Sequence, residues 1–266
     1  MFERFVKERK YLKNVSARTI DWYGESFKWL GNEDPSQSDL NDFVIRMRDK
    51  GLTPASCNNR IRAVNAYLKW KGSHLTIPRL KEELKPVSVF KTPDISKILA
   101  FKPSSKQRRT HTILLLIFDA GLRASECIGL KVEDIDFDNL LIAVKGKGNK
   151  HRQVPMSQEL RKILWKFCGR RTGYVFCTKD GKPVMRRNLL REVKRLCLRI
   201  GIVPPKRTVH AGRHTMATEY IRQGGSVVKL QRILGHSSIT TTMKYVHLQG
   251  QDLIEEHQRL GILGRR

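Results

Sequence analysis

The chain is poor in acidic side chains, in long apolar runs and in paired cysteines. It holds 25 Asp and Glu residues against 52 Lys and Arg residues, which gives a formal net charge of +27. Its longest apolar run, Ile113 to Phe118, is far too short to span a bilayer, and the N-terminus lacks the apolar stretch of a signal peptide. These absences argue against a membrane or secreted protein, and the charge favours a polyanionic partner, most simply a nucleic acid.

The cysteines are odd in number and scattered, and no two form a CxxC pair. Buried free thiols in a reducing cytosol explain this pattern best, so a cytoplasmic protein is expected, associated with the nucleoid if its partner is DNA. Most of the excess positive charge lies in residues 91–266, which predicts that this part forms the main electrostatic surface. The five positions are Cys57, Cys127, Cys168, Cys177 and Cys197.

Helix signals divide the chain into two domains. Residues 1–72 read as a helical bundle, with Ser16 as an N-cap, Thr53-Pro54 as a cap followed by a proline in the first turn, and apolar residues at helical spacing between them. Residues 73–90 carry two prolines, several lysines and little periodicity, which predicts a linker. Residues 91–266 then form a second domain, whose first helix begins at Thr92-Pro93.

The second domain has a mixed pattern. Residues 112–120 form an apolar helix, and residues 135–137, 140–145 and 152–156 read as three short strands joined by turns. The expected fold is mainly α with a small antiparallel β-meander. Further helices are expected over 157–168, 188–200, from near His210, over 227–234, on a short segment carrying Tyr245, and over 253–263.

Six side chains in this domain form a set suited to phosphodiester chemistry. Arginine forks bind phosphate oxygens bidentately and stay protonated, and a tyrosine can act as nucleophile if a proton acceptor and a positive site lie nearby. Such a set can break a phosphodiester without a metal. Its members, each within a short motif such as GLRASE, GKG, HAGRHT or LGH, are Arg123, Lys147, His210, Arg213, His236 and Tyr245.

Several of these assignments leave alternatives open. Glu126, three residues after Arg123, is expected on the same helical face, either to orient that arginine or as a plain intrahelical pair. Lys147 is preferred as proton donor by its place at a hairpin tip, but Lys145 and Lys150 compete with it. His210 and His214 have HxxxH spacing, yet no nearby Glu or Cys completes a zinc site, so no metal is expected.

In their order these motifs closely resemble those of the tyrosine recombinase, or phage integrase, family, and in particular its compact Xer-like site-specific recombinases. GLRASE at 121–126 resembles the first arginine box, GKGNK at 146–150 the hairpin lysine motif, and HAGRHT with LGH the second box. The resemblance is strong over residues 92–250. It implies a helical core-binding domain followed by a mixed α/β catalytic domain. No arm-binding domain like that of larger integrases is expected, which favours simple core sites.

The resemblance also implies a mechanism. Tyr245 would attack the scissile phosphate and form a 3′-phosphotyrosyl bond, without metal, ATP or any other cofactor. The phosphate would be held by Arg123, Arg213 and His236. Lys147 would protonate the leaving 5′ oxygen, and His210 would assist proton transfer, with Glu126 and His214 as supporting residues. Four protomers would assemble on two duplex DNA sites, with the helix at 253–263 docking into a neighbour.

Two alternatives remain. A type IB topoisomerase would use similar groups to nick and reseal one strand as a monomer, although the GLRxSE motif and the helix beyond Tyr245 favour a recombinase. A non-catalytic DNA-binding regulator would suit the charge but would not need the nucleophile. Basic residues expected to contact DNA are Arg60, Arg62, Lys69, Lys71 and Lys150.

Overall fold

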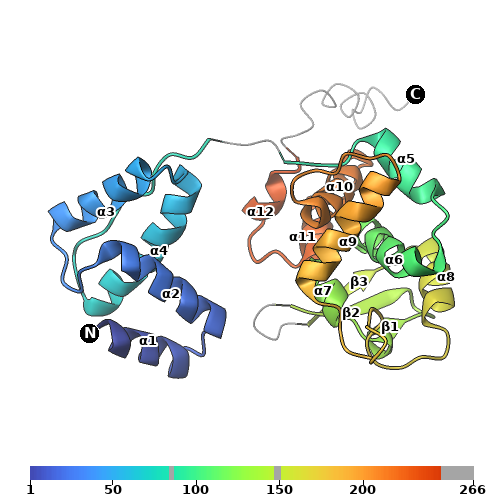
Figure 1. Cartoon of the computed structure of the whole chain (residues 1–266), viewed down its shortest axis with the longest axis horizontal. Coiled ribbons are helices and arrows are strands. Elements are labelled where there is room, and N and C mark those ends of the chain that lie inside the picture. The colour runs from blue at the N-terminus through green and yellow to red at the C-terminus, as the bar shows by residue number, and fades with distance from the viewer. Residues whose placement is uncertain (84–86, 147–150, 247–266) are drawn as a thin grey trace, which may run out of the picture. The chain divides into compact units, whose positions relative to one another are not determined.

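The computed structural model describes residues 1–83, 87–146 and 151–246. The chain forms two compact units, Met1–Lys85 and Pro86–Arg266, which are coloured blue to cyan and green to red in Figure 1. No helix in the part of the chain that the structure describes is long and apolar enough to cross a membrane.

The first unit is a bundle of helices that begin and end at clear capping signals. The Thr53 side chain accepts a hydrogen bond from the backbone N–H of Ser56, and Pro54 opens the helix that follows. Ser36 and Asp39 form a reciprocal capping box at the start of another helix. The helices are α1 (Phe2–Tyr11), α2 (Ala17–Leu30), α3 (Gln37–Asp49) and α4 (Pro54–Lys71).

An aromatic cluster forms the core of this unit. The Phe5 ring is fully buried and packs in T-shaped geometry with the rings of Tyr23 and Tyr67, whose centroids lie 4.9 and 5.5 Å away. The Tyr67 hydroxyl donates to the carbonyl of Glu33 at 2.7 Å, so the ring is buried without leaving its polar end unpaired. Sequence periodicity did not predict α1, whose apolar residue Phe5 closes this core.

Much of the segment expected as a linker, 73–90, packs against one unit or the other. On α4, the Asn65 amide donates to the Ile77 carbonyl at 2.9 Å and accepts from the Ile77 N–H at 3.0 Å. The Asn58 amide makes the same pair of hydrogen bonds with the backbone of Leu80, both at 2.8 Å. At the other end, the N–H of Phe90 donates to the Thr215 hydroxyl in the second unit at 2.8 Å. The stretch between these attachments is therefore shorter than the sequence suggested.

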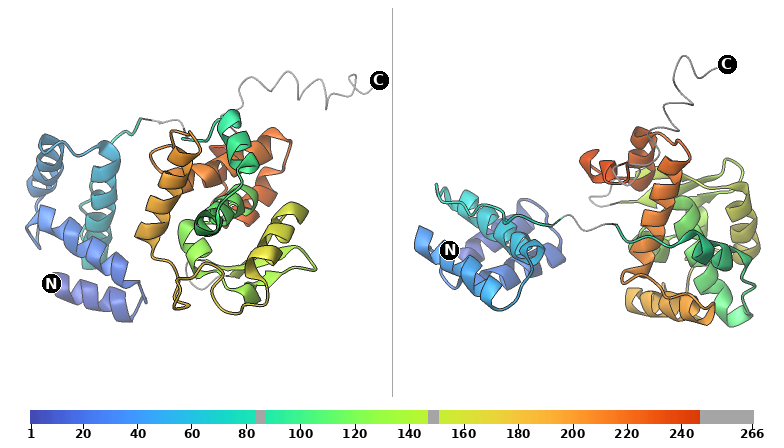
Figure 2. Two further views of the ribbon diagram at one scale, coloured as in Figure 1. Left: turned by 45° about the vertical axis from the view of Figure 1, so that its right-hand side comes forward. Right: turned by 90° about the horizontal axis from the view of Figure 1, so that it is seen from above.

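The second unit is built around α6 (Ser105–Ala120), which packs against α8, α9 and α10 and occupies the middle of the unit in Figure 2. A capping box between Ser104 and Gln107 starts this helix earlier than the apolar run at 112–120 indicated. The other helices are α5 (Thr92–Ala100), α7 (Ala124–Gly129), the 3-10 turn η1 (Val132–Asp134), α8 (Gln158–Cys168), α9 (Arg186–Arg199), α10 (Thr208–Arg222), α11 (Val227–Leu234) and α12 (Thr240–Met243).

A small antiparallel sheet of three strands, in the order β1-β2-β3, packs at one end of this unit (Figure 1). The strands are β1 (Ile135–Asp136), β2 (Leu141–Lys145) and β3 (His151–Pro155), with Ile142 opposite Val154. Both of these side chains are fully buried. The predicted meander and the mainly α fold class are confirmed, with strand ends shifted by one residue.

Candidate active site

A buried carboxylate, Glu126, gathers three arginines from separate elements of the second unit. Arg123 is the N-cap of α7, and both its backbone N–H and its Nη1 donate to Glu126 at 2.8 Å. Arg152, from β3, binds both carboxylate oxygens, at 2.8 and 2.9 Å. Arg213, from α10, approaches to 3.9 Å. The expected shared helical face is wrong, because Arg123 precedes the helix and reaches Glu126 through cap geometry.

The charges of this cluster do not cancel. The Glu126 side chain is 4% exposed, and burial by itself would raise its pKa. Hydrogen bonds from Arg152 and Arg123 outweigh burial and lower the pKa to about 2, so the group is ionised at neutral pH. One carboxylate then faces three guanidiniums, and the surplus positive charge suits a phosphate.

Two backbone carbonyls hold the guanidinium of Arg213 in place. Its Nη1 donates to Gly121 and its Nη2 to Leu234, each at 2.6 Å, and the residue is only 5% exposed. Gly121 has a φ of 64°, and a Cβ there would lie 3.1 Å from the Met216 sulfur. Burial and the neighbouring Arg123 lower the Arg213 pKa to about 10, which leaves it protonated at neutral pH.

His236 follows the left-handed Gly235 at the end of α11, and its N–H donates to the Gln231 carbonyl at 3.1 Å. Its Nε2 lies 3.3 Å from Arg213 Nη2, and its Nδ1 lies 2.9 Å from the Thr242 hydroxyl. An arginine can only donate, so Nε2 accepts and Nδ1 carries the hydrogen. Burial and the charge of Arg213 lower the His236 pKa to about 4, and the ring is neutral at neutral pH.

Arg123 is the accessible guanidinium of the cluster. Its side chain is 36% exposed, and its Nη2 donates to the Gly235 carbonyl at 3.3 Å. This contact brings the end of α11, and with it His236, to the start of α7. Arg123, Arg213 and His236 therefore meet at one place, although they lie on three segments of the chain.

Tyr245 lies in the turn after α12, two residues beyond its last residue, Met243, so its expected place on a helix is wrong. Its ring is buried, and its hydroxyl lies 2.7 Å from Nδ1 of His214 on α10. Burial raises the Tyr245 pKa to about 12, although the charges of Arg213 and Arg123 oppose this shift. The phenol is therefore neutral in the free protein.

His210 occupies a different environment from the arginine that it precedes by three residues. It is exposed on α10, whereas Arg213 is buried, and among the described residues its imidazole makes no hydrogen bond. Partial burial and the charge of Arg186 at the start of α9 lower its pKa. His210 thus borders the site from the solvent side.

Sequence comparison places the chain in a known family. A model of the phage integrase family matches residues 89–252. Tyrosine recombinase XerA of Pyrococcus furiosus is 31% identical over 264 residues, covering 95% of this chain and 91% of that protein. Tyrosine recombinase XerC of Xanthomonas campestris pv. campestris is 30% identical over 277 residues, covering 94% and 85%.

The chain belongs to the phage integrase family. It is a Xer-like, tyrosine-type site-specific recombinase, as the motifs predicted. Solved structures agree with the fold. A crystal structure of XerA recombinase has 25% identity and a TM-score of 0.57, with 97% of this chain and 96% of that one covered. The Tn1549 transposon integrase in complex with circular intermediate DNA has 22% identity and a TM-score of 0.74, with 91% and 93% covered.

Arg152 is a member of the candidate site that the motifs did not reveal. Besides its two bonds to Glu126, its Nε donates to the Ile233 carbonyl at 2.8 Å, and its side chain is 13% exposed. A Cβ at Gly235 would lie 2.9 Å from the Arg152 Cδ. Arg152 therefore links β3 to both α7 and the end of α11. The sequence offers one hint. Side chains alternate between the two faces of a strand, so Arg152 shares a face with the buried Val154, where a basic residue is unexpected.

Some predicted site residues of the recombinase lie outside the described residues. These are Lys147 and Lys150 on the hairpin between β2 and β3, and the segment 253–263. Lys145, the competing proton donor, ends β2 and lines a pocket together with Glu126 and His151. Across the described ranges, no three His, Cys, Asp or Glu side chains come together as a metal site would require.

The basic residues proposed for DNA contact in the first unit differ in availability. The guanidiniums of Arg60 and Arg62 lie over Trp29 and Trp22, at 5.5 and 5.6 Å from the ring centroids. Lys69 is exposed, whereas Lys71 pairs with Asp34 and its side chain is 18% exposed. Contact with a phosphate would require Lys71 to leave this partner.

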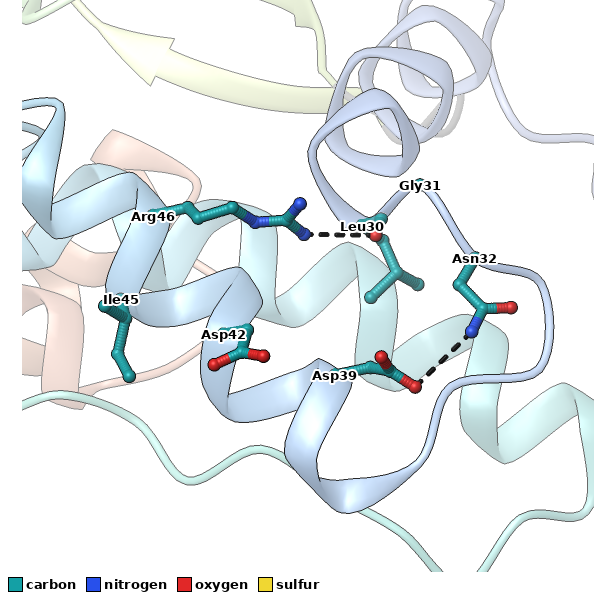
Figure 3. A pocket seen from close by; sticks show the side chains of 7 residues that line it. All are labelled: Leu30, Gly31, Asn32, Asp39, Asp42, Ile45 and Arg46. Atoms are coloured by element: carbon teal, nitrogen blue, oxygen red, sulfur yellow. Dashed lines mark hydrogen bonds between the residues drawn. The ribbon is translucent and has the colours of Figure 1, made fainter.

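The first unit also has a pocket that none of these basic residues lines (Figure 3). Its rim includes two carboxylates, Asp39 and Asp42, and Asn32 donates to Asp39 at 3.4 Å. Arg46 points its guanidinium at the Leu30 carbonyl, at 3.3 Å. Because the acidic groups would repel a phosphate, this pocket does not suit the phosphodiester backbone of DNA.

Proposed function

We propose that this recombinase cleaves and rejoins duplex DNA at specific sites through a 3′-phosphotyrosyl intermediate on Tyr245. The observation that carries the proposal is the convergence of Arg123, Arg213, His236 and Tyr245, from four separate segments, on one positively charged site. The phenolate oxygen attacks the phosphorus, the P–O5′ bond breaks, and the protein–DNA ester conserves the bond energy. This chemistry needs neither metal nor ATP.

Each of the groups within the described residues has a role that its surroundings support. Arg123, whose side chain is partly exposed, and the buried Arg213 bind the non-bridging oxygens and stabilise the charge that develops on them. His236 joins them once phosphate charge raises its pKa and allows Nε2 to carry a proton. Lys147 protonates the departing 5′ oxygen, and His210, at the solvent side, assists proton transfer.

The partner is double-stranded DNA in the nucleoid, bound by both units. Four protomers act on two sites, and the segment 253–263 docks into a neighbouring protomer. The net charge of +27 supports the DNA partner, and affinity should fall steeply with salt.

A covalent adduct tests the proposed function directly. A duplex nicked near the scissile phosphate traps the intermediate, because the short released strand diffuses away. The wild-type protein should form a denaturant-resistant adduct in the presence of EDTA, and Tyr245→Phe should bind the same DNA without forming it. An adduct with Tyr245→Phe would show that another residue is the nucleophile. Strand exchange between two sites, rather than supercoil relaxation by single protomers, separates a recombinase from a topoisomerase.

A further inference from the structure

The hydrogen bond between Tyr245 and His214 connects the proposed nucleophile to a group whose chemistry the mechanism above does not use. His214 lies on α10 directly after Arg213, and its Nδ1 is 2.7 Å from the Tyr245 hydroxyl. A phenol is the stronger donor of the two groups and a neutral imidazole nitrogen is a good acceptor. The bond therefore runs from the tyrosine to the histidine, which carries its own hydrogen on Nε2.

His214 is kept neutral by its surroundings. Partial burial, then the positive charge of Lys244 next to the tyrosine, lowers its pKa to about 4. His210, Arg213 and Arg207 act in the same direction. An imidazole that is neutral at working pH has an open site for a proton, and here that site already faces the phenolic hydrogen.

We infer that His214 takes the phenolic proton of Tyr245 during strand cleavage and returns it during religation. In cleavage the O–H bond of Tyr245 breaks and its proton moves to His214 Nδ1. The Oη–P bond forms, the P–O5′ bond breaks, and the 5′ oxygen takes a proton from a separate donor, Lys147 in the proposed mechanism. This inference rests on the proposed function, and it makes His214 a catalytic residue rather than a support.

His210 is less suited to this proton transfer. The His210 side chain is exposed, and among the described residues it has no hydrogen bond to Tyr245 or to any other group, whereas His214 contacts the reacting oxygen. A general base must lie within about 2.6–3.2 Å of the atom that it deprotonates, and in this structure His214 meets that condition.

The same geometry explains why the free protein does not hold a phenolate. The pKa of Tyr245 is raised to about 12 while that of His214 is lowered to about 4, so the proton stays on the tyrosine. A bound phosphodiester places negative charge beside Arg213 and Lys244, and this charge offsets the repulsion that lowers the His214 pKa. Proton transfer then accompanies attack on the phosphorus.

Asparagine at position 214 separates positioning from proton transfer, because its amide can hold the phenol but cannot accept its proton. His214→Asn should bind DNA within a few-fold of wild type and cleave a nicked duplex about 10²- to 10⁴-fold more slowly in a single turnover. Its log rate should rise with pH at a slope near one, because the phenol must ionise unaided, whereas the wild-type rate stays flat across the neutral range. Religation should slow by the same factor, because the same proton returns.

Two further variants keep this test decisive. His214→Gln offers a second amide should the asparagine variant fold poorly. His111→Asn removes another buried imidazole, whose Nε2 lies 2.8 Å from the Ile98 carbonyl on α5, and should lower stability without changing the pH profile. A His214 amide variant that cleaves within a few-fold of wild type, or that keeps the flat profile, overturns the inference. So does acquisition of the slope by His210→Asn.

The outcome is distinguishable from failure of the proposed function. If the proposed function fails, the wild-type protein itself forms no adduct, or Tyr245→Phe still forms one. If only the inference fails, wild type forms the adduct, Tyr245→Phe does not, and the His214 amide variants keep the wild-type pH profile.

Discussion

The two units bury different kinds of polar side chain. In the first, the buried amide of Asn58 and the nearby Asn65 are used to hold the chain segment around Ile77 and Leu80, and the core beneath them is aromatic. In the second, ionised Glu126 and Arg213 are buried to 4% and 6% side-chain exposure. A satisfied amide costs little to bury, whereas a buried ion persists only with partners in good geometry. In the first unit the buried polar groups thus hold a chain segment in place, whereas in the second they hold charged groups together.

The buried charges of the second unit lower its stability in favour of its function. The positive charges of Arg123, Arg152 and Arg213 repel one another. The negative charge of Glu126 offsets part of this repulsion and keeps the three side chains close. Replacing such a buried cluster by apolar side chains would cost no stability in many proteins. Its presence in the second unit therefore fits a binding task, because a phosphate could supply the missing negative charge.

Arg152→Met should have the largest effect, because it leaves the buried Glu126 without its bidentate partner. Breaking a buried pair by removing one member costs about 3–5 kcal/mol. Hydrogen exchange of the α6 amides measures the loss in the second unit. Adduct formation should fall with it, because the end of α11 beside His236 loses the hydrogen bond from Arg152 to the Ile233 carbonyl. Adding Glu126→Gln should recover part of the stability, as expected for coupled neighbours.

Arg109→Met is the matched control for that change. Arg109 also binds a carboxylate through both oxygens, those of Glu192 at 3.2 and 3.1 Å, but the two side chains are 33% and 30% exposed. Solvent screening should limit its cost to about 1 kcal/mol or less. Equal losses from the two variants would show that burial does not set the value of the Glu126 cluster.

Acid should weaken the second unit through the same carboxylate. The folded pKa of Glu126, about 2, lies below its unfolded value, so its contribution is complete above about pH 4.5 and is lost as pH falls toward 2. The loss should be on the order of 3 kcal/mol. Wild type compared with Glu126→Gln in urea unfolding at pH 6 and pH 3 isolates it. A gap between the two proteins that stays constant with pH would contradict the assignment.

Asn65→Ala should have a smaller effect than loss of the Glu126 cluster and should leave the second unit untouched. It removes both hydrogen bonds to Ile77, and unpaired backbone groups cost about 1–3 kcal/mol, less where water reaches them. The fluorescence of Trp22, Trp29 and Trp70, all in the first unit, reports the loss during urea unfolding. Faster exchange of the Ile77 amide should accompany it, and an unchanged rate would show that the segment is held by its apolar contacts alone.

Local sequence predicted the elements well where caps and periodicity agree. Val227–Leu234 matches the expected helix, and Thr53-Pro54 marks the start of a helix as anticipated. Prediction was poorer where polar residues occupy a helix, as in the first turns of α6, because side-chain period gives no signal there. It also failed for Tyr245, where α12 ends without a glycine or proline to mark the boundary.

The sequence by itself determined most of the helices, the meander, the family and the chemical types in the site, because each depends on residues close together in the chain. Only the tertiary structure decided which groups touch. Arg152 reaches Glu126 across 26 positions, and His214 meets Tyr245 across 31. Neither pairing leaves a local trace, since an arginine on a strand and a histidine on a helix look the same with or without such a partner. The packing of α7, β3, α10 and α11 brings these side chains within hydrogen-bond reach, and that packing is a property of the whole second unit.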